Sequence, residues 1–489
     1  MNPPGFPPDA GAVVPAIDTA SSTAALRALG RRGVPTVAVS EKATPPGFAS
    51  EYCDETVPVP DPTVDLAAYE TALIDLARRD DVGTVLPMRE SDVYALARNR
   101  DALTDHVGAP WPTLDALRRA QDRVELFAAA RRAGVGMPAT RRLDEWDDWD
   151  RDVIVKPRYT VHAAEYSDRF AESHTQCSST RYVAPDESLD REELVAEMGH
   201  VPLVQEYVPA SDEYGFFALY DEGEAVATFQ HRQRRGWKYS GGPSAYRESV
   251  DIPELEAAGL RLLDELEWHG VAMVEFLRDP DTGEFKLMEV NPRFWSSLPF
   301  TVQAGVDFPG LLWRLAGGES IDRAPDYEVG AAGHLLRGEL LHLHSVAADD
   351  YPLVERPSLA RRALEIGASL VRHPRFDYLS ADDPGPFVRD VRNAVAAYRG
   401  KRTTTSPPSA SADDRPSSAD RPSADDRPSR ADRPSGIDSP SGIDRLSEVD
   451  RLSEADRPSE ADRPSEADRP SGADRPSGAR VALQTLLRR

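Results

Sequence analysis

Two apolar stretches separated by a turn form the clearest hydrophobic pattern in the chain. Residues 271–277 and 285–290 are mostly apolar, and the sequence Pro-Asp-Thr-Gly at 280–283 lies between them. Short apolar runs bounded by turn residues are typical of β-strands. The pattern therefore predicts a β-hairpin whose strands carry two acidic residues in otherwise apolar surroundings.

Those acidic residues are Glu275 and Glu289. With the turn centred near residues 281 and 282, Glu275 is predicted to lie almost directly opposite Glu289, and Asn291 shares the face of Glu289 because side chains alternate along a strand. Facing like charges destabilise a sheet, so a cation is expected there, and two carboxylates with an amide oxygen suit Mg²⁺. A register shifted by one residue, which turns one acid towards solvent, is the alternative.

The first hundred residues alternate short apolar runs with helical stretches. Runs at 12–17, 36–40 and 84–88 predict strands, and this alternation indicates a small parallel sheet wound with helices. Such sheets bind ligands at the carboxyl ends of their strands, where the chain places Asp18, Arg89, Glu90 and Ser91. The first and last of these are equally expected as helix caps. No GxGxxG sequence follows the first strand, which argues against a dinucleotide site.

The middle of the chain carries positive charges where an anionic partner is expected. A helix is predicted over 122–134, closed by glycine and then proline, and the apolar strand 152–156 ends in Lys156. A lysine at that position is costly without an anion. A further strand is predicted at 202–208. The arginine-rich segment 231–247 predicts either a glycine-bearing loop whose cations are directed at an anion or a solvated loop paired with neighbouring acids.

Beyond the hairpin the pattern becomes less informative. Residues 321–400 predict a mixed, mostly helical extension. From 401 to 478 the sequence Ala-Asp-Arg-Pro-Ser-Glu recurs with a six-residue period and offers almost nothing to bury, which is typical of a disordered tail. The final residues, 479–489, are compatible with a short helix.

Composition narrows the class of partner. The 489-residue chain has a formal net charge of -25 and two cysteines. The charge argues against nucleic acid or an anionic membrane as the main partner, and the scarcity of cysteine favours a reducing cytoplasm. No apolar run approaches the length of a membrane span. The acidic, lysine-poor composition resembles that of proteins from salt-loving archaea, so stability is expected to depend on salt.

The order of these features resembles that of the ATP-grasp superfamily of carboxylate-amine or carboxylate-thiol ligases. The resemblance rests on the Ile-Val-Lys-Pro strand, the Gln-Glu-Tyr-Val strand, the Gly-Gly-bearing segment and the hairpin that ends in Glu-Val-Asn-Pro-Arg, and it covers residues 10–320. It implies an α/β fold, α+β in its ATP-grasp part. A small wound parallel-sheet domain is implied at 10–115 and a two-lobed ATP-grasp domain at 116–320.

The resemblance also implies a role for each matching residue. Lys156 is implied to contact the α/β-phosphates of ATP, and Arg123 is implied to bind the nucleotide. The hinge around adenine is implied to consist of Gln205, Glu206 and Val208, and Glu213 is implied to accept the ribose hydroxyls. One or two Mg²⁺ ions, with Mn²⁺ as an alternative, are implied on Glu275, Glu289 and Asn291. Two arginines are implied in catalysis: Arg293 on the phosphates or the developing oxyanion, and Arg232, with Gly241 and Gly242, beside the acceptor substrate.

The implied activity is that of an ATP- and Mg²⁺-dependent ligase, which activates a small-molecule carboxylate as an acyl phosphate for attack by an amine. A homodimer is left open. Two departures bear on this activity. Arg123 stands where many relatives have lysine, which keeps the charge but not the geometry. The segment after Lys156 lacks the glycines that many relatives lay over the phosphates. The alternatives are a bicarbonate or thiol acceptor, or a nucleotide-binding protein with weakened catalysis and an interaction tail.

Overall fold

The computed structural model describes residues 5–168, 170, 180–183, 185, 189–209, 212–321, 325–351 and 354–404. Every element below lies in the unit Met1–Gly436. The predicted start of the tail at residue 401 falls inside the last helix, α13 (Gly385–Thr404). The remainder of the predicted tail and the terminal segment 479–489 lie outside the described residues.

The N-terminal part forms the predicted parallel sheet. Its strand order is β3-β2-β1-β4, and every neighbouring pair is parallel. Helices and a 3₁₀ turn connect the strands, and their apolar faces pack on β1, β2 and β4, whose residues are all buried, whereas β3 at the edge is mostly exposed. The elements are β1 (Gly11–Pro15), α1 (Ala20–Gly30), β2 (Thr36–Ser40), η1 (Pro46–Ala49), β3 (Glu55–Pro58), α2 (Leu66–Ala77), β4 (Val82–Val85), α3 (Glu90–Arg98) and α4 (Arg100–Leu103).

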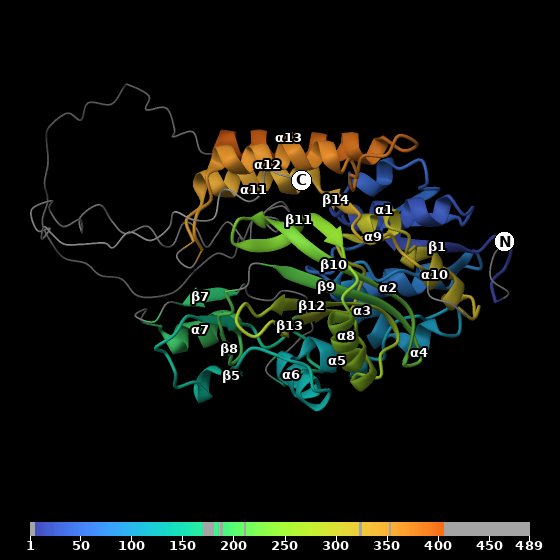
Figure 1. Ribbon diagram of the computed structural model, residues 1–489. Helices are drawn as coiled ribbons and strands as arrows, with labels where there is room; N and C mark the ends of the chain where they lie inside the picture. The colour runs from blue at the N-terminus through green and yellow to red at the C-terminus, as the bar shows by residue number, and fades with distance from the viewer. Residues whose placement is uncertain are drawn as a thin grey trace, which may run out of the picture. The chain divides into compact units, whose positions relative to one another are not determined.

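A small antiparallel sheet follows, with strand order β5-β8-β6-β7. Apolar side chains from one of its faces and from helix α7 form a separate core. Figure 1 shows this lobe beside β12 and β13. The elements are α5 (Leu114–Gln121), α6 (Arg123–Arg132), β5 (Thr140–Arg142), η2 (Leu143–Glu145), β6 (Val153–Lys156), β7 (Arg181–Val183), α7 (Arg191–Met198) and β8 (Leu203–Glu206).

A six-stranded antiparallel sheet lies at the centre, in the order β13-β12-β9-β10-β11-β14. Its two faces belong to different cores because side chains alternate along each strand. Phe217 packs with the N-terminal strands, whereas Phe216 packs with helix α8. The elements are β9 (Glu213–Asp221), β10 (Glu224–Lys238), β11 (Gly241–Ser249), α8 (Pro253–Glu265), β12 (Gly270–Arg278), β13 (Phe285–Asn291), α9 (Leu298–Gln303), α10 (Phe308–Ala316) and β14 (Ala332–His334).

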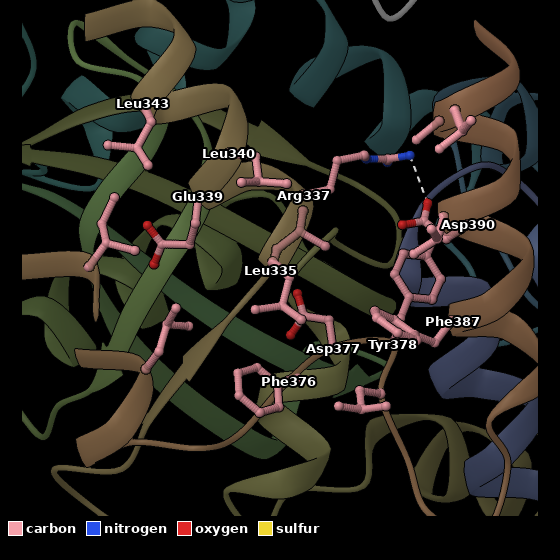
Figure 2. Close-up of a pocket in the computed structure, with 17 residues that line it drawn as sticks. Leu335, Arg337, Glu339, Leu340, Leu343, Phe376, Asp377, Tyr378, Phe387 and Asp390 are labelled. Carbon is pink, nitrogen blue, oxygen red and sulfur yellow. Dashed lines mark hydrogen bonds and ion pairs between the residues drawn. The ribbon is translucent and has the colours of Figure 1, made fainter. Parts of the chain in front are cut away.

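The predicted helical extension supplies strand β14 to the central sheet and three helices beside it. Helices α11 (Leu336–Ala348), α12 (Leu359–Arg372) and α13 lie side by side (Figure 1). They line an apolar groove of about 650 Å³. Figure 2 shows that the ion pair between Arg337 and Asp390 links α11 to α13 at this groove. Among the described helices, none has both the length and the apolar character of a membrane span.

Replacing a helical glycine by alanine is expected to change the stability of the protein in opposite directions at two positions. A Cβ at Gly259 in α8 meets the ring of Phe216, with Cδ1 at 2.2 Å, whereas a Cβ at Gly367 in α12 meets nothing within 4 Å. Gly259→Ala is therefore expected to cost about 1–3 kcal/mol through overpacking. Gly367→Ala is expected to stabilise by about 0.5–1 kcal/mol, since alanine loses less backbone entropy. Urea unfolding of both variants checks the signs, and a stabilising Gly259→Ala would contradict the packing of α8 on β9.

Candidate nucleotide and metal site

The site is built around two facing carboxylates on the hairpin of β12 and β13. Glu275 pairs directly with Glu289 in the strand register, so the predicted juxtaposition is confirmed. Removal from solvent, then the Glu289 and Glu213 carboxylates, raise the pKa of Glu275 to about 8. Burial and the neighbouring carboxylates both disfavour the charged form of Glu275, and perturbed pKa values of this kind cluster at functional sites.

Cationic side chains approach the pair from two neighbouring elements. Arg123, the first residue of α6, places Nη2 at 3.1 Å from Oε2 of Glu289. Lys156 ends strand β6, and burial, then Arg123, lower its pKa to about 8 against the opposing effect of the acids. Burial by itself would raise the pKa of Glu289, but Arg123 and Lys156 outweigh it and the pKa is lowered. An anion placed beside Lys156 would stabilise its charged form.

Asn291 and Arg293 continue the site beyond the hairpin. The amide Nδ2 of Asn291 donates to Oε1 of Glu275 at 3.0 Å, and Nη2 of Arg293 donates to Oδ1 of Asn291 at 2.7 Å. Arg293 Nε also lies 3.2 Å from Oε1 of Glu90. Glu90 follows the carboxyl end of β4, so the N-terminal sheet reaches the acid pair through this arginine.

The predicted hinge lies at the end of β8, and its side chains are engaged within the protein. Nε2 of Gln205 donates to the Thr140 hydroxyl at 2.9 Å, and the Glu206 carboxylate pairs with Lys286 Nζ at 3.0 Å. Val208 is buried immediately after the strand. These contacts fix the end of the strand and occupy the polar side chains of Gln205 and Glu206 within the protein.

Glu213, at the start of β9, belongs electrostatically to the same site. Burial, then the Glu289 carboxylate, raise its pKa to about 7, and Lys156 opposes them. Its Oε2 accepts a hydrogen bond from Nε2 of Gln233 at 2.7 Å. The site therefore contains three acids, Glu213, Glu275 and Glu289, from three adjacent strands of the central sheet.

Known proteins share this arrangement of sheets. A family model described as the ATP-binding domain of the carbamoyl-phosphate synthase L chain matches residues 227–324. N5-carboxyaminoimidazole synthetase from Staphylococcus aureus aligns with a TM-score of 0.53 at 13% identity, over 75% of this chain and 99% of its own. The chain has the ATP-grasp fold. The predicted resemblance to this superfamily is thereby confirmed at the level of the fold.

Two further solved structures align with about two thirds of the chain. Biotin carboxylase from Campylobacter jejuni aligns with a TM-score of 0.50 at 15% identity, over 66% of this chain and 74% of its own. Pyruvate carboxylase from Rhizobium etli aligns with a TM-score of 0.51 at 18% identity, over 66% of this chain, and the match spans only 29% of the length of that protein. No curated protein matches the chain in sequence.

Arg232 does not join the other predicted residues of the ATP-grasp site. It pairs with Tyr214 in the strand register, and Tyr214 packs in the core with Phe276, on the face opposite Glu275. Its guanidinium instead lies 2.7 Å from a carboxylate oxygen of Asp212. Alternation along β10 therefore separates Arg232 from the acid pair.

The basic segment 231–247 is a strand pair rather than the predicted loop. Strands β10 and β11 occupy all of it except the connection between Lys238 and Gly241. Its arginines meet protein carboxylates: Arg234 pairs with Glu248, Arg235 with Glu339, and Arg247 with Asp377. The structure supports only part of the second alternative: the charges pair with acids, but the segment is not a solvated loop, since Arg235 and Arg247 are buried.

The segment after Lys156 packs into the N-terminal core instead of projecting over the site. Tyr159, Val161, Ala163 and Tyr166 join the core formed by β1, β4 and α3. Arg158 pairs with Asp122, with Nη2 and Oδ2 2.6 Å apart. Within residues 157–168, bulky side chains stand in place of glycines and attach the segment to the N-terminal core.

The other polar residues predicted at the carboxyl ends of the N-terminal strands have separate partners. Asp18 pairs with Lys42, and Arg89 pairs with Glu41 and Asp92. No group of three or more His, Cys, Asp and Glu side chains arranged for a metal ion is found in the described ranges.

His231 shares the central sheet with the site and predicts an acid-dependent loss of stability. Burial, then Arg247, lower its pKa to about 3. The unfolded chain binds this proton near pH 6.5 and the folded protein does not, so stability is complete above pH 6.5 and falls as the pH drops towards 3. His231→Leu is expected to reduce the loss between pH 6.5 and 4.5 by about 2 kcal/mol. Urea unfolding at each pH measures it, with the exposed His106→Gln as a control expected to keep the wild-type slope.

Proposed function

We propose that this protein is an ATP- and Mg²⁺-dependent ligase that activates a small-molecule carboxylate for attack by an amine. The observation that carries the proposal is the register of Glu275 against Glu289, with Lys156 and Arg123 beside them. A sheet that places two acids opposite each other loses stability. A bound cation and the phosphates it accompanies would recover that loss.

The donor set fits a hard divalent cation. Glu275 and Glu289 offer carboxylate oxygens, the donors that Mg²⁺ prefers. Asn291 would offer its amide oxygen in exchange for the hydrogen bond that this oxygen accepts from Arg293. When bound, Mg²⁺ would supply neutralisation of the phosphate oxygens. Mn²⁺ would satisfy the same donors. The fit rests on two acids and one amide, not on a larger acidic cluster.

The remaining residues would bind and orient the nucleotide. Lys156 and Arg123 would neutralise the phosphates, Glu213 would accept the ribose hydroxyls, and the hinge after β8 would meet adenine through backbone groups of Gln205, Glu206 and Val208. Arg293 would hold the transferred phosphoryl group or the developing oxyanion. Arg232 has no part in the proposal because it lies on the opposite face of the sheet.

The chemistry would proceed in two displacements. The substrate carboxylate attacks the γ-phosphorus, the bond from γ-phosphorus to the bridging oxygen breaks, and ADP leaves. The amine then attacks the acyl carbon, inorganic phosphate leaves, and the amine loses a proton. The protein's contribution is positioning and charge neutralisation, which explains a site rich in cations and carboxylates without a serine or cysteine nucleophile.

A nucleotide-binding protein with weakened catalysis is the second candidate, and one observation favours it. The segment after Lys156 is anchored in the N-terminal core, so its backbone is not free to close over the phosphates in the way that glycine-rich loops do. In this candidate the site would bind MgATP without transferring the γ-phosphoryl group.

Thermal unfolding with ATP, in high-salt buffer with and without Mg²⁺, tests nucleotide binding. A hundredfold excess of ATP over its dissociation constant is expected to stabilise the protein by about 2.7 kcal/mol. Phosphate release is then screened with pooled carboxylates and amines, and with bicarbonate and thiols in separate arms. Release that requires both a carboxylate and an amine supports the ligase; binding without release under every arm supports the second candidate. No Mg²⁺-dependent shift in a folded sample would overturn both.

A further inference from the structure

A buried glutamine connects three parts of the chain that meet beside the proposed site. Gln121 is the last residue of α5 and is 0% exposed. Its Nε2 donates to Oε2 of Glu90 at 2.7 Å, and its Oε1 accepts from the Tyr166 hydroxyl at 2.6 Å. Its backbone carbonyl accepts from the Thr160 amide at 3.0 Å. One residue thus holds the segment after Lys156 and an acid of the N-terminal sheet at the same time.

The two side-chain hydrogen bonds fix the orientation of the amide. A carboxylate accepts hydrogen bonds, so Nε2 must face Glu90 and Oε1 must face Tyr166. Burial, then Tyr94 and the neighbouring acids, raise the pKa of Tyr166, which keeps its hydroxyl a donor. The ring itself is locked in the N-terminal core. Glu90 is therefore held in place by the Gln121 amide, which has a single orientation.

Glu90 in turn sets the position of Arg293. Its Oε1 forms an ion pair with Arg293 Nε at 3.2 Å. Arg293 Nη2 donates to Asn291, and Asn291 donates to Glu275. A series of hydrogen bonds and one ion pair therefore runs from Tyr166 through Gln121, Glu90, Arg293 and Asn291 to Glu275. Without Glu90 in place, the guanidinium of Arg293 would be drawn to the uncompensated acid pair and would occupy the position of a cation.

We propose that Gln121 is a positioning residue, which holds Glu90 against Arg293 and so keeps the acid pair open for the metal–nucleotide complex. This inference rests on the proposed function. It assigns the segment after Lys156 a role other than covering the phosphates: through Tyr166, the segment supports the arginine that faces them. Partners of this kind, one step removed from the ligands, set metal affinity by orienting the ligands.

If Gln121 only stabilised the fold, other substitutions that remove a buried hydrogen bond in this region would alter the response to Mg²⁺ equally. The chain offers a matched control for this alternative. The Tyr94 hydroxyl donates to Glu165 in the same segment, and its ring packs edge-on against that of Tyr166. Tyr94→Phe and Tyr166→Phe therefore each delete one buried phenol hydroxyl that binds within this region. Only Tyr166 is connected to Glu90 through Gln121.

The measured quantity is the Mg²⁺ concentration that gives half of the ATP-induced rise in the thermal midpoint of the full chain. Gln121→Met is expected to raise it about tenfold, Tyr166→Phe to raise it in the same direction, and Tyr94→Phe to leave it unchanged. Should Gln121→Met fail to fold, Tyr166→Phe carries the test, since it removes one oxygen atom.

Two outcomes separate this inference from the proposed function. Suppose that the wild type responds to MgATP, but Gln121→Met and Tyr166→Phe show the same Mg²⁺ requirement, or Tyr94→Phe shifts it equally. The positioning role is then overturned, and the proposed function stands. A wild-type protein whose midpoint does not respond to ATP and Mg²⁺ overturns the proposed function and the positioning role with it.

Discussion

Glu289→Gln is expected to abolish the Mg²⁺-dependent stabilisation of the protein by ATP. The substitution keeps the size of the side chain but removes one of two facing carboxylates and the charge that pairs with Arg123. If Glu289 holds the cation as proposed, its loss is expected to weaken MgATP binding by about a hundredfold. At an ATP concentration that stabilises the wild type by about 2.7 kcal/mol, the variant would then gain only about 0.4 kcal/mol.

Thermal unfolding with and without Mg²⁺ measures this difference, and the same hairpin supplies the control. Glu284 lies at the exposed turn between β12 and β13, so Glu284→Gln removes the same charge without touching the site. It is expected to retain the full wild-type response. If Glu289→Gln also retained it, the acid pair would have no part in binding the metal–nucleotide complex, and the central claim of the proposal would fail.

The register of this hairpin could be predicted because its determinants are local. A turn signal between two apolar runs fixes which residues face each other, and Glu275 and Glu289 are only a few residues from that turn. The N-terminal parallel sheet could be predicted for a related reason, since strands alternating with helices admit few arrangements. The hairpin depends on sequence neighbours, whereas the sheet follows from the order of its elements, since its strands pair across long separations, as Ala12 does with Thr84.

The partners of the basic strands could not be predicted because they are remote in sequence. Arg235 binds Glu339 and Arg247 binds Asp377, both in the extension that completes the central sheet. Composition reveals an excess of arginine in this segment but not the acids that fold back onto it. The face of Arg232 was missed similarly: its side-chain direction follows from strand pairing that a presumed loop does not have.

The segment after Lys156 shows the same limit in another form. Its lack of glycine was visible in the sequence, but the consequence depends on what lies opposite. Tyr159 and Tyr166 pack into the N-terminal core, a contact between parts of the chain that periodicity does not connect. Gln121 could not be predicted for a different reason: a single uncharged amide forms no recognisable sequence motif. Its role depends only on its hydrogen bonds to Glu90 and Tyr166.

Arg247→Met is expected to destabilise the protein by about 3–5 kcal/mol, because it leaves an unpaired charge in the interior. Arg247 is 0% and Asp377 2% exposed. The pair joins strand β11, which carries Arg247, to the connection between α12 and α13, which carries Asp377. Burial raises the pKa of Asp377, and Arg247 opposes it. Loss of the arginine removes that opposition, so Asp377 must be either buried as a charge or protonated.

Urea unfolding at neutral pH and fixed salt measures the cost, with Arg234→Met as the control. Arg234 on β10 pairs with Glu248 on β11, but their side chains are 36% and 29% exposed, so removal of Arg234 is expected to cost less than about 1 kcal/mol. Within the described residues, Nε and Nη1 of Arg247 have no hydrogen-bond partner, which leaves this pair incompletely satisfied. The double variant Arg247→Met/Asp377→Leu is therefore expected to recover most of the lost stability, since apolar side chains often replace a buried ion pair without loss. Equal costs for Arg247→Met and Arg234→Met would show instead that the extension does not depend on this pair for its attachment to the sheet.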